Sequence, residues 1–195
     1  CIRDRASVVL LSGGPGTGKT STVVEILARV EARHPGLRIG LAAPTGKAAR
    51  RLGEAVMAQR APLPCSTLHR WLEAGSRGFG RHRQRPLELD LLVIDEMSML
   101  DLALTQALLE ALPSGCRLLL VGDPAQLPPV GSGAVWHRLQ QSDVRGRFGA
   151  GAVHLERTYR NRGALAQVAQ QLRQGNLEAF AADLDALPAQ ANLQV

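Results

Sequence analysis

The sequence predicts an α/β domain whose β-sheet is mostly parallel and carries helices on both faces. Short, continuously apolar runs alternate along the chain with longer stretches of helical periodicity. Strands that are apolar throughout are typical of a parallel sheet that is covered on both sides. Polar motifs rich in Gly, Pro and Asp follow several of the apolar runs, at the strand ends where such sheets bind ligands.

The first half of the chain alternates expected strands and helices. The expected elements are a strand at 7–12, a helix at 19–33, a strand at 38–43, a helix at 46–59 and a short helix at 66–73. Pro35 and Gly36 are expected to stop the first helix. Ser66 or Thr67 is expected to cap the short one, because a side-chain oxygen there can accept a free backbone N–H.

The second half begins with a break in this pattern. Residues 75–86 hold three glycines, five basic residues and one aromatic, which indicates an exposed loop or a short hairpin. The elements expected after it are a strand at 89–94, a helix at 100–112, a strand at 117–121, a loop at 123–133, a strand at 153–156, a helix at 164–173 and a helical tail at 176–187.

The composition indicates a globular protein. The chain has 195 residues, of which 45% are hydrophobic and 21% charged. No apolar run approaches the roughly 18 residues of a transmembrane helix and no signal-peptide pattern is present, so we expect no membrane partner. Cys1, Cys65 and Cys116 are odd in number and far apart, which indicates a reducing compartment and a cytoplasmic location. The chain starts without a methionine, and we expect its start to be a boundary within a longer protein.

The charge balance leaves two interpretations open. The formal net charge is +6, and Lys19 and Lys47 are the only lysines, so arginine supplies most of the positive charge. Arginine is well suited to phosphate contacts, and a basic domain of this size fits a nucleic-acid partner. A GC-rich genome that favours Ala and Arg would produce the same composition.

The motif GGPGTGKT at residues 13–20 predicts a phosphate-binding loop. It matches G-x-x-x-x-G-K-[ST], directly after an expected strand and at the start of an expected helix. Its backbone amides and the helix N-terminus can surround the phosphates of a nucleotide. Lys19 can reach the β- and γ-phosphates, and the Thr20 hydroxyl can ligate Mg²⁺.

Two further strand ends carry residues suited to nucleotide hydrolysis. Asp95 follows the apolar run LLVI and can hold Mg²⁺ through its water shell. Glu96 is then placed to orient and deprotonate an attacking water, which indicates hydrolysis rather than transfer to a second substrate. In the segment VGDPAQLPPV, Gln126 can bind a γ-phosphate and lose that bond on hydrolysis. The alternatives are a solvated strand end and a rigid surface turn.

Together these segments resemble a known family. The order GGPGTGKT, APTGKAA, STLHRWL, VIDEMSM, VGDPAQLPPV and ERTYR is similar to the first motor domain of a superfamily 1 DNA helicase. APTGKAARRL and STLHRWL resemble the exodeoxyribonuclease V alpha-subunit, or RecD, type. The resemblance covers residues 8–175 and implies a RecA-like P-loop NTPase fold. We therefore expect residues 1–175 to form the motor domain, with a short basic loop at 74–88 in the place of an inserted subdomain.

The resemblance also implies roles for individual residues. It implies that ATP and Mg²⁺ are bound by Gly14, Gly16, Thr17, Gly18, Lys19, Thr20, Ser21, Asp95 and Asp123, with Thr20 and Asp95 at the metal. It implies that catalysis depends on Lys19, Glu96, Gln126 and Arg160, with Glu96 as the base and Gln126 and Arg160 at the γ-phosphate. It implies that the single-stranded DNA backbone is contacted by Pro44, Thr45, Gly46, Lys47, Thr67 and His69.

Some of these nucleic-acid contacts have plain structural alternatives. Lys47, after Thr-Gly at a helix start, is a ready phosphate site, but Lys47 and Arg50 would also suit a solvated helix face. His69 would equally suit a packed or capping position. With six aromatic residues in the whole chain, base stacking is expected to be sparse and binding to depend on phosphates and on salt concentration.

No segment after ERTYR resembles the second motor domain of this family, which we therefore expect to be missing from this chain. We expect residues 176–195 to be a tail that leads towards it. A missing arginine finger costs roughly 10³–10⁵ in rate, so the chain alone is expected to hydrolyse ATP slowly. The resemblance implies 5′-to-3′ movement and partner subunits of an exodeoxyribonuclease V-type complex in double-strand break repair. A free-standing helicase, an RNA helicase and a nucleotide-gated assembly module remain alternatives.

Overall fold

The computed structural model describes residues 8–156. The helix expected at 164–173, the tail at 176–195 and Arg160 lie outside the described residues. The expected division of the chain at residue 175 therefore stays a prediction.

A six-stranded, fully parallel sheet forms the centre of the molecule, with the strand order β3-β2-β6-β7-β1-β8. The strands are β1 (Val8–Gly13), β2 (Ile39–Ala43), β3 (Cys65–Thr67), β6 (Leu91–Ile94), β7 (Arg117–Gly122) and β8 (Ala152–Leu155). Because all six run in one direction, their carboxyl ends share one edge of the sheet, and the motifs that follow β1, β2, β6 and β7 lie at that edge.

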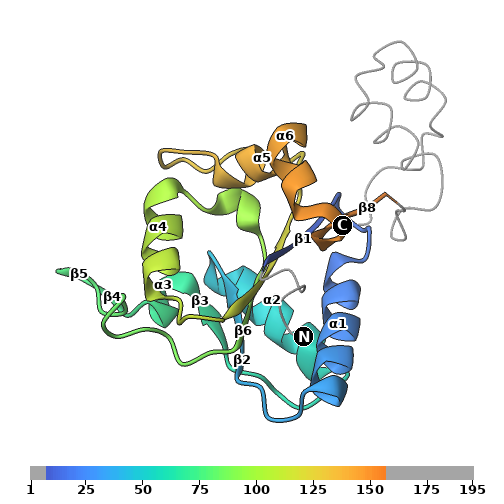
Figure 1. The fold of residues 1–195 in the computed structure, drawn as a ribbon, viewed down its shortest axis with the longest axis horizontal. Helices are drawn as coiled ribbons and strands as arrows, with labels where there is room; N and C mark the ends of the chain where they lie inside the picture. Colours follow the sequence, from blue (N-terminus) through green and yellow to red (C-terminus); the bar gives the residue numbers. More distant parts are fainter. Residues whose placement is uncertain (1–7, 157–195) are drawn as a thin grey trace, which may run out of the picture.

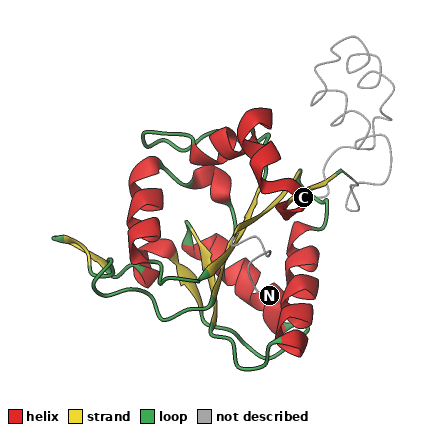
Figure 2. Cartoon of the chain, viewed as in Figure 1, coloured by secondary structure: helices red, strands yellow, loops and turns green. Residues whose placement is uncertain are grey.

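Helices cover both faces of the sheet, so the expected three-layer α/β architecture is confirmed. Figure 1 shows α1 (Lys19–Arg33) and α4 (Leu102–Ala111) on opposite sides of the strands, and Figure 2 shows the strands between the two sets of helices. The remaining helices are α2 (Gly46–Met57), α3 (Leu68–Trp71), α5 (Val135–Gln140) and α6 (Ser142–Arg145), with 3-10 turns η2 (Met97–Met99) and η3 (Gly146–Gly151).

Each face of the sheet has its own hydrophobic core. Side chains of successive strand residues point to opposite faces, so Leu10 belongs to one core and Leu11 to the other. The first core packs α3, α4 and Trp136 of α5 against the sheet. The second packs α1 and α2 against the other face. Leu92, Val93 and Ile94 of β6 are fully buried, as expected for strands covered on both sides.

The structure corrects the expectation in three places. The helix expected at 66–73 begins only at Leu68, and residues Cys65–Thr67 before it form the edge strand β3. Thr67 rather than Ser66 is the cap, and its Oγ1 accepts the Arg70 N–H at 3.3 Å. The helices α5 and α6 were not anticipated. The helix expected at 100–112 starts at Leu102 because the 3-10 turn η2 precedes it.

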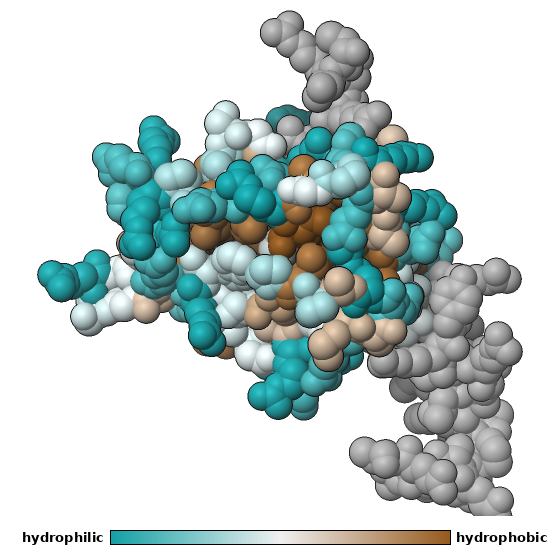
Figure 3. Space-filling model, turned by 90° about the horizontal axis from the view of Figure 1, so that it is seen from below, coloured by the Kyte–Doolittle hydropathy of each residue, from teal (hydrophilic) through white to brown (hydrophobic). Residues whose placement is uncertain are grey.

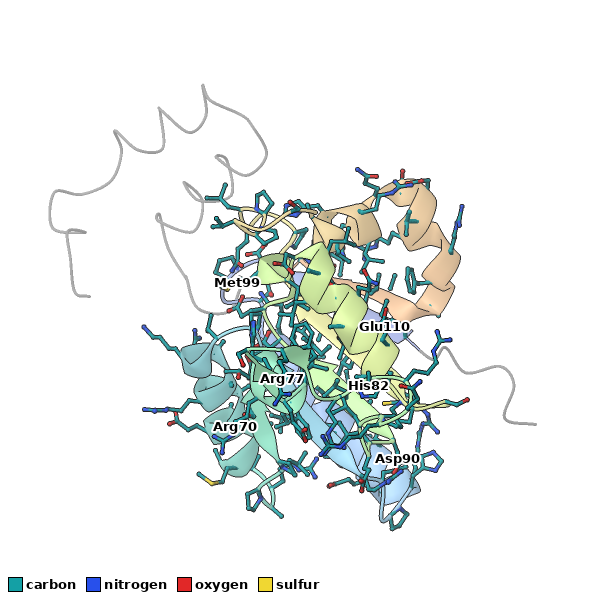
Figure 4. The ribbon with its side chains drawn as sticks, turned by 90° about the vertical axis from the view of Figure 1, so that its left-hand side faces the viewer. Arg70, Arg77, His82, Asp90, Met99 and Glu110 are labelled. Carbon is teal, nitrogen blue, oxygen red and sulfur yellow. The ribbon has the colours of Figure 1, made fainter. Side chains whose placement is uncertain are left out.

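The basic segment at 75–86 begins with a short hairpin, one of the two forms expected from the sequence. Strands β4 (Ala74–Gly75) and β5 (Gly78–Phe79) pair antiparallel. Glu73 binds Arg81 at 2.8 Å and Arg85 at 2.7 Å, and the hydrogen bond from Arg81 is the main cause that lowers the pKa of Glu73. Arg70, Arg77 and His82 lie on this side of the molecule (Figure 4).

The surface seen from below the view of Figure 1 is mixed in character. Hydrophilic side chains project around its rim, and hydrophobic residues show in the middle of the face (Figure 3). Among residues 8–156, no helix has the length and apolar character needed to cross a membrane.

Candidate functional site

A cleft of about 710 Å³ opens at the carboxyl edge of the sheet. It lies where β1, β6 and β7 end, so it collects residues that are far apart in the sequence. Its lining includes all of residues 14–21 together with Asp95, Glu96, Asp123 and Gln126. All described residues that the sequence assigned to nucleotide binding or catalysis therefore line a single cavity.

The loop between β1 and α1 has the geometry of a phosphate-binding loop. Gly16 and Gly18 have φ of 74° and 86°, a left-handed conformation that glycine adopts without a steric penalty. The Thr17 hydroxyl donates to the Gly14 carbonyl at 2.8 Å and holds the loop closed. The Lys19 ammonium reaches back across the loop and donates to the Gly13 carbonyl at 2.6 Å. The loop thus places a cation at the N-terminus of α1, an arrangement that binds phosphates.

Asp95, at the end of β6, is the acid best placed to hold a cation in the cleft. Burial raises the pKa of its carboxyl, and the adjacent Glu96 charge adds to the rise. The backbone N–H of Glu96, which donates to Oδ1 at 2.9 Å, and the charge of Lys19 oppose it. Hydroxyl and carboxylate oxygens suit Mg²⁺, which proteins hold with one or two carboxylates plus phosphates and water. Thr20 and Asp95 in the same cleft fit that donor set.

Replacing Asp95 with asparagine is expected to raise the melting temperature of the ligand-free chain at neutral pH. A raised folded-state pKa means that the ionised carboxylate opposes folding as pH rises through that pKa, and asparagine removes the charge. Mg²⁺-dependent nucleotide binding is expected to weaken by at least about tenfold, because contacts to a charged group contribute about 1.5–3 kcal/mol. Thermal unfolding and titration with a fluorescent nucleotide, with and without Mg²⁺, measure the two effects.

Asp90→Asn is the matched control for that prediction, and it is expected to change the melting temperature in the opposite direction. The Arg38 side chain lowers the pKa of Asp90 to about 2, so Asp90 stabilises the fold at neutral pH and loses this effect as pH falls towards 2. Asp90→Asn should lower the melting temperature slightly and leave nucleotide binding unchanged. A lower melting temperature for Asp95→Asn would contradict the role of burial at Asp95.

Glu96 and Gln126 meet across the ends of two neighbouring strands. Glu96 follows β6 with φ of 55°, which is uncommon for a residue other than glycine and costs on the order of 1 kcal/mol. Gln126 lies in the loop after β7, and its Nε2 is 3.4 Å from Glu96 Oε2. A proton acceptor and an amide donor therefore face the same part of the cleft.

Asp123 stabilises the loop after β7 that carries Gln126. It is only 3% exposed, and its Oδ1 accepts the Ala125 N–H at 2.9 Å. Its carboxylate therefore shapes the turn that presents Gln126, in addition to lining the cleft.

One wall of the cleft was not anticipated. Arg51 and Glu54 of α2 line it together with Gln59, which follows the helix. The sequence shows a helix with one basic face there, but which side chains turn towards the cleft depends on how α2 packs on α1.

The residues assigned to nucleic-acid contact are brought together at the same edge of the sheet. Four of them, Pro44, Thr45, Gly46 and Lys47, follow β2. Thr67 is the last residue of the neighbouring strand β3, where it pairs with Ala43, and His69 lies two residues further on. The Thr45 and Thr67 hydroxyls also cap α2 and α3. His69 is exposed, so the packed position considered from the sequence is wrong.

Comparisons with known proteins agree with this geometry. A family model described as an AAA domain matches residues 3–132. The chain is 43% identical over 175 residues to the "ATP-dependent RecD2 DNA helicase" of Deinococcus radiodurans, covering 89% of this chain and 22% of that protein. It is 40% identical over 199 residues to the "RecBCD enzyme subunit RecD" of Mycolicibacterium smegmatis, covering 92% of this chain and 35% of that one. The chain thus spans about a third or less of these relatives.

Solved structures show the same fold. Pif1 of Bacteroides bound to single-stranded DNA superimposes with a TM-score of 0.58 at 21% identity, covering 95% of this chain and 46% of that one. Pif1 of Candida albicans gives a TM-score of 0.56 at 23% identity, covering 85% of this chain and 40% of that one. At these identities the likeness concerns the fold alone.

Proposed function

Because this chain belongs to the AAA-domain family, we propose that it is the first motor domain of an ATP-dependent DNA helicase of the RecD type. In the complete protein it binds and hydrolyses ATP, and the hydrolysis drives movement along single-stranded DNA and unwinding of duplex DNA. One observation carries the proposal: Lys19, Asp95, Glu96 and Gln126, from three different strand ends, line one cleft.

Each of these groups has a defined task in the proposed reaction. The loop amides and Lys19 bind the β- and γ-phosphates. Thr20 and Asp95 hold Mg²⁺, which supplies neutralisation of phosphate charge when bound. Glu96 accepts the proton of the attacking water, and Gln126 donates to the γ-phosphate. The convergence of an acid, an amide and a lysine in the cleft supports hydrolysis rather than mere nucleotide binding.

The DNA path is proposed to cross the ends of β2 and β3. The residues Gly46 and Lys47 open α2 directly after its cap Thr45, and the N-terminus of a helix favours phosphate. Lys47 and His69 are exposed beside them. These contacts address the backbone and not the bases, so little sequence preference is expected.

The wider setting is proposed from the relatives. A second motor domain of the complete protein is expected to close over the nucleotide, and Arg160 is expected to contact the γ-phosphate from the end of the first. One relative is by name a RecBCD enzyme subunit, which supports assembly with other subunits in double-strand break repair. The scattered cysteines, which indicate a reducing compartment, support a cytoplasmic location.

ATP hydrolysis by the complete protein, with and without single-stranded DNA or RNA of matched sequence, tests the proposal. Stimulation by DNA of at least about tenfold, which is absent in a Glu96→Gln variant, is the expected result. The chain alone is expected to turn over slowly, because a missing arginine finger costs about 10³–10⁵ in rate. Stimulation by RNA alone would move the protein to the RNA helicases. ATP binding without stimulation by either would favour a nucleotide-gated assembly module.

A further inference from the structure

A buried serine links the two strand ends that carry Glu96 and Gln126. Ser98 lies in η2, two residues after Glu96, and its Oγ donates to Gln126 Oε1 at 2.5 Å. The Ser98 residue is 0% exposed. The bond therefore connects the segment after β6 with the loop after the neighbouring strand β7.

The chemistry of the amide makes this bond consequential. The two ends of a glutamine amide have nearly the same shape, but only Nε2 carries hydrogens to donate. A γ-phosphate offers acceptors alone, so Gln126 can bind it only through Nε2. The Ser98 hydroxyl donates to Oε1, and the carboxylate of Glu96, which can only accept, faces Nε2, so these two neighbours together fix which end of the amide faces the cleft. In the structure Nε2 faces Glu96 Oε2 at 3.4 Å, the side on which the reaction is proposed to occur.

The surroundings of Ser98 hold its hydroxyl in place. The adjacent Met97 is 1% exposed and Leu100 is 0% exposed, so η2 is anchored in the core. The Leu100 N–H also donates to the Met97 carbonyl at 3.1 Å, which closes the turn. Because Ser98 is fully buried, its hydroxyl has the Gln126 amide as its partner in place of water. A buried hydroxyl without a partner is costly, so the same bond that orients Gln126 also satisfies Ser98.

We propose that Ser98 is a positioning residue that sets the orientation of the Gln126 amide and so keeps its N–H₂ group aimed at the γ-phosphate and the catalytic base. The inference rests on the proposed ATPase function and on the sensor role of Gln126. The hydrogen bond between Ser98 and Gln126 connects the segment that carries Asp95 and Glu96, the proposed metal ligand and base, to the loop that follows β7.

The test is a double-mutant cycle in the complete protein, measuring DNA-stimulated ATP hydrolysis. Ser98→Ala is expected to lower kcat by about five- to tenfold, the factor of one ordinary hydrogen bond, with the KM for ATP changed less than about twofold. Gln126→Ala should lower kcat at least as much. In the Gln126→Ala background, Ser98→Ala should have no further effect, because the group that it positions is already gone.

Two further variants separate positioning from a general structural effect. Ser98→Thr keeps the hydroxyl and should restore most of kcat. Thr105→Ala removes a hydroxyl that donates to the Asp101 carbonyl at 2.7 Å in α4, away from the cleft, and should leave kcat unchanged. Thermal unfolding of every variant accounts for loss of folded protein.

The outcomes distinguish this inference from the proposed function. If Gln126→Ala slows hydrolysis but Ser98→Ala does not, or if the two effects multiply, Ser98 does not position Gln126 and only this inference falls. If Gln126→Ala leaves hydrolysis unchanged, the sensor role falls and the inference falls with it. If the wild-type protein shows no DNA-stimulated hydrolysis, the proposed function itself is wrong.

Discussion

Replacing Glu96 with glutamine is expected to lower DNA-stimulated ATP hydrolysis by the complete protein by about 10²–10⁴-fold, the contribution of a general base. Glutamine keeps the shape of the side chain but cannot accept a proton. Nucleotide binding should be almost unchanged, because the phosphate loop and Lys19 are untouched. The variant should therefore bind ATP and fail to turn it over.

Single-turnover hydrolysis and nucleotide titration separate these two quantities. Glu54→Gln is the matched control, because Glu54 lines the same cleft from α2 and the change is chemically identical. It should alter the rate by no more than about twofold if Glu54 takes no part in proton transfer. Equal losses in both variants, or a Glu96→Gln variant that keeps most of its rate, would show that Glu96 is not the base.

The backbone at Glu96 gives this prediction additional weight. Its left-handed φ is held in place because the Glu96 N–H donates to Asp95 Oδ1 and its carbonyl accepts from Met99. Strain of this kind persists only where the surrounding structure enforces it, and it is often found at functional sites. Here it turns the chain sharply after β6, so that Asp95 and Glu96 both line the cleft.

The parts of the fold that the sequence predicts are those with a strong local signal. The helix α1 begins and ends at the predicted residues, because a glycine loop fixes its start and Pro35-Gly36 its end. The strand β6 is apolar throughout and β7 is apolar after Arg117, and both lead directly into polar motifs. The described nucleotide-site residues follow from the same motifs, since parallel strands bring their carboxyl ends to one edge.

The parts that the sequence did not reveal depend on contacts between distant segments. The strand β3 has three residues and exists as a strand only through its pairing with β2. The helices α5 and α6 are too short to show a helical period. Ser98 gave one usable signal, a polar residue between Met97 and Met99 in an otherwise apolar run. Its partner Gln126 is 28 residues away and could be identified only from the structure.

The largest stability effect is expected at Trp136, which neither the motifs nor the periodicity indicated. Trp136 belongs to α5, is 1% exposed and packs in the same hydrophobic core as α3 and α4. Gly122, the last residue of β7, makes room for it, because a Cβ there would lie 2.7 Å from the indole Cε2. The indole thus packs against the strand end from which the loop with Asp123 and Gln126 departs.

Replacing Trp136 with alanine is expected to lower the free energy of unfolding by about 3–5 kcal/mol, the range for deleting a large buried aromatic side chain. Urea unfolding of the chain measures it. The Trp136 Nε1 is buried and lacks a partner within residues 8–156, so Trp136→Phe should cost clearly less, because it removes that unsatisfied group and keeps most of the ring. Leu109→Ala is the exposed control and should change stability by no more than about 0.5 kcal/mol.

The Trp136→Ala substitution is also expected to lower the rate of ATP hydrolysis, because Trp136 packs against the end of β7. Without the indole, the core next to Gly122 is no longer filled. The loop that carries Gln126 then loses a packing contact at the strand end from which it departs. Under conditions where the Trp136→Ala variant is still folded, kcat for ATP hydrolysis should therefore fall more than it does for Trp136→Phe. Equal kcat in the two variants, despite their different stabilities, would show that Trp136 stabilises the domain without shaping the site.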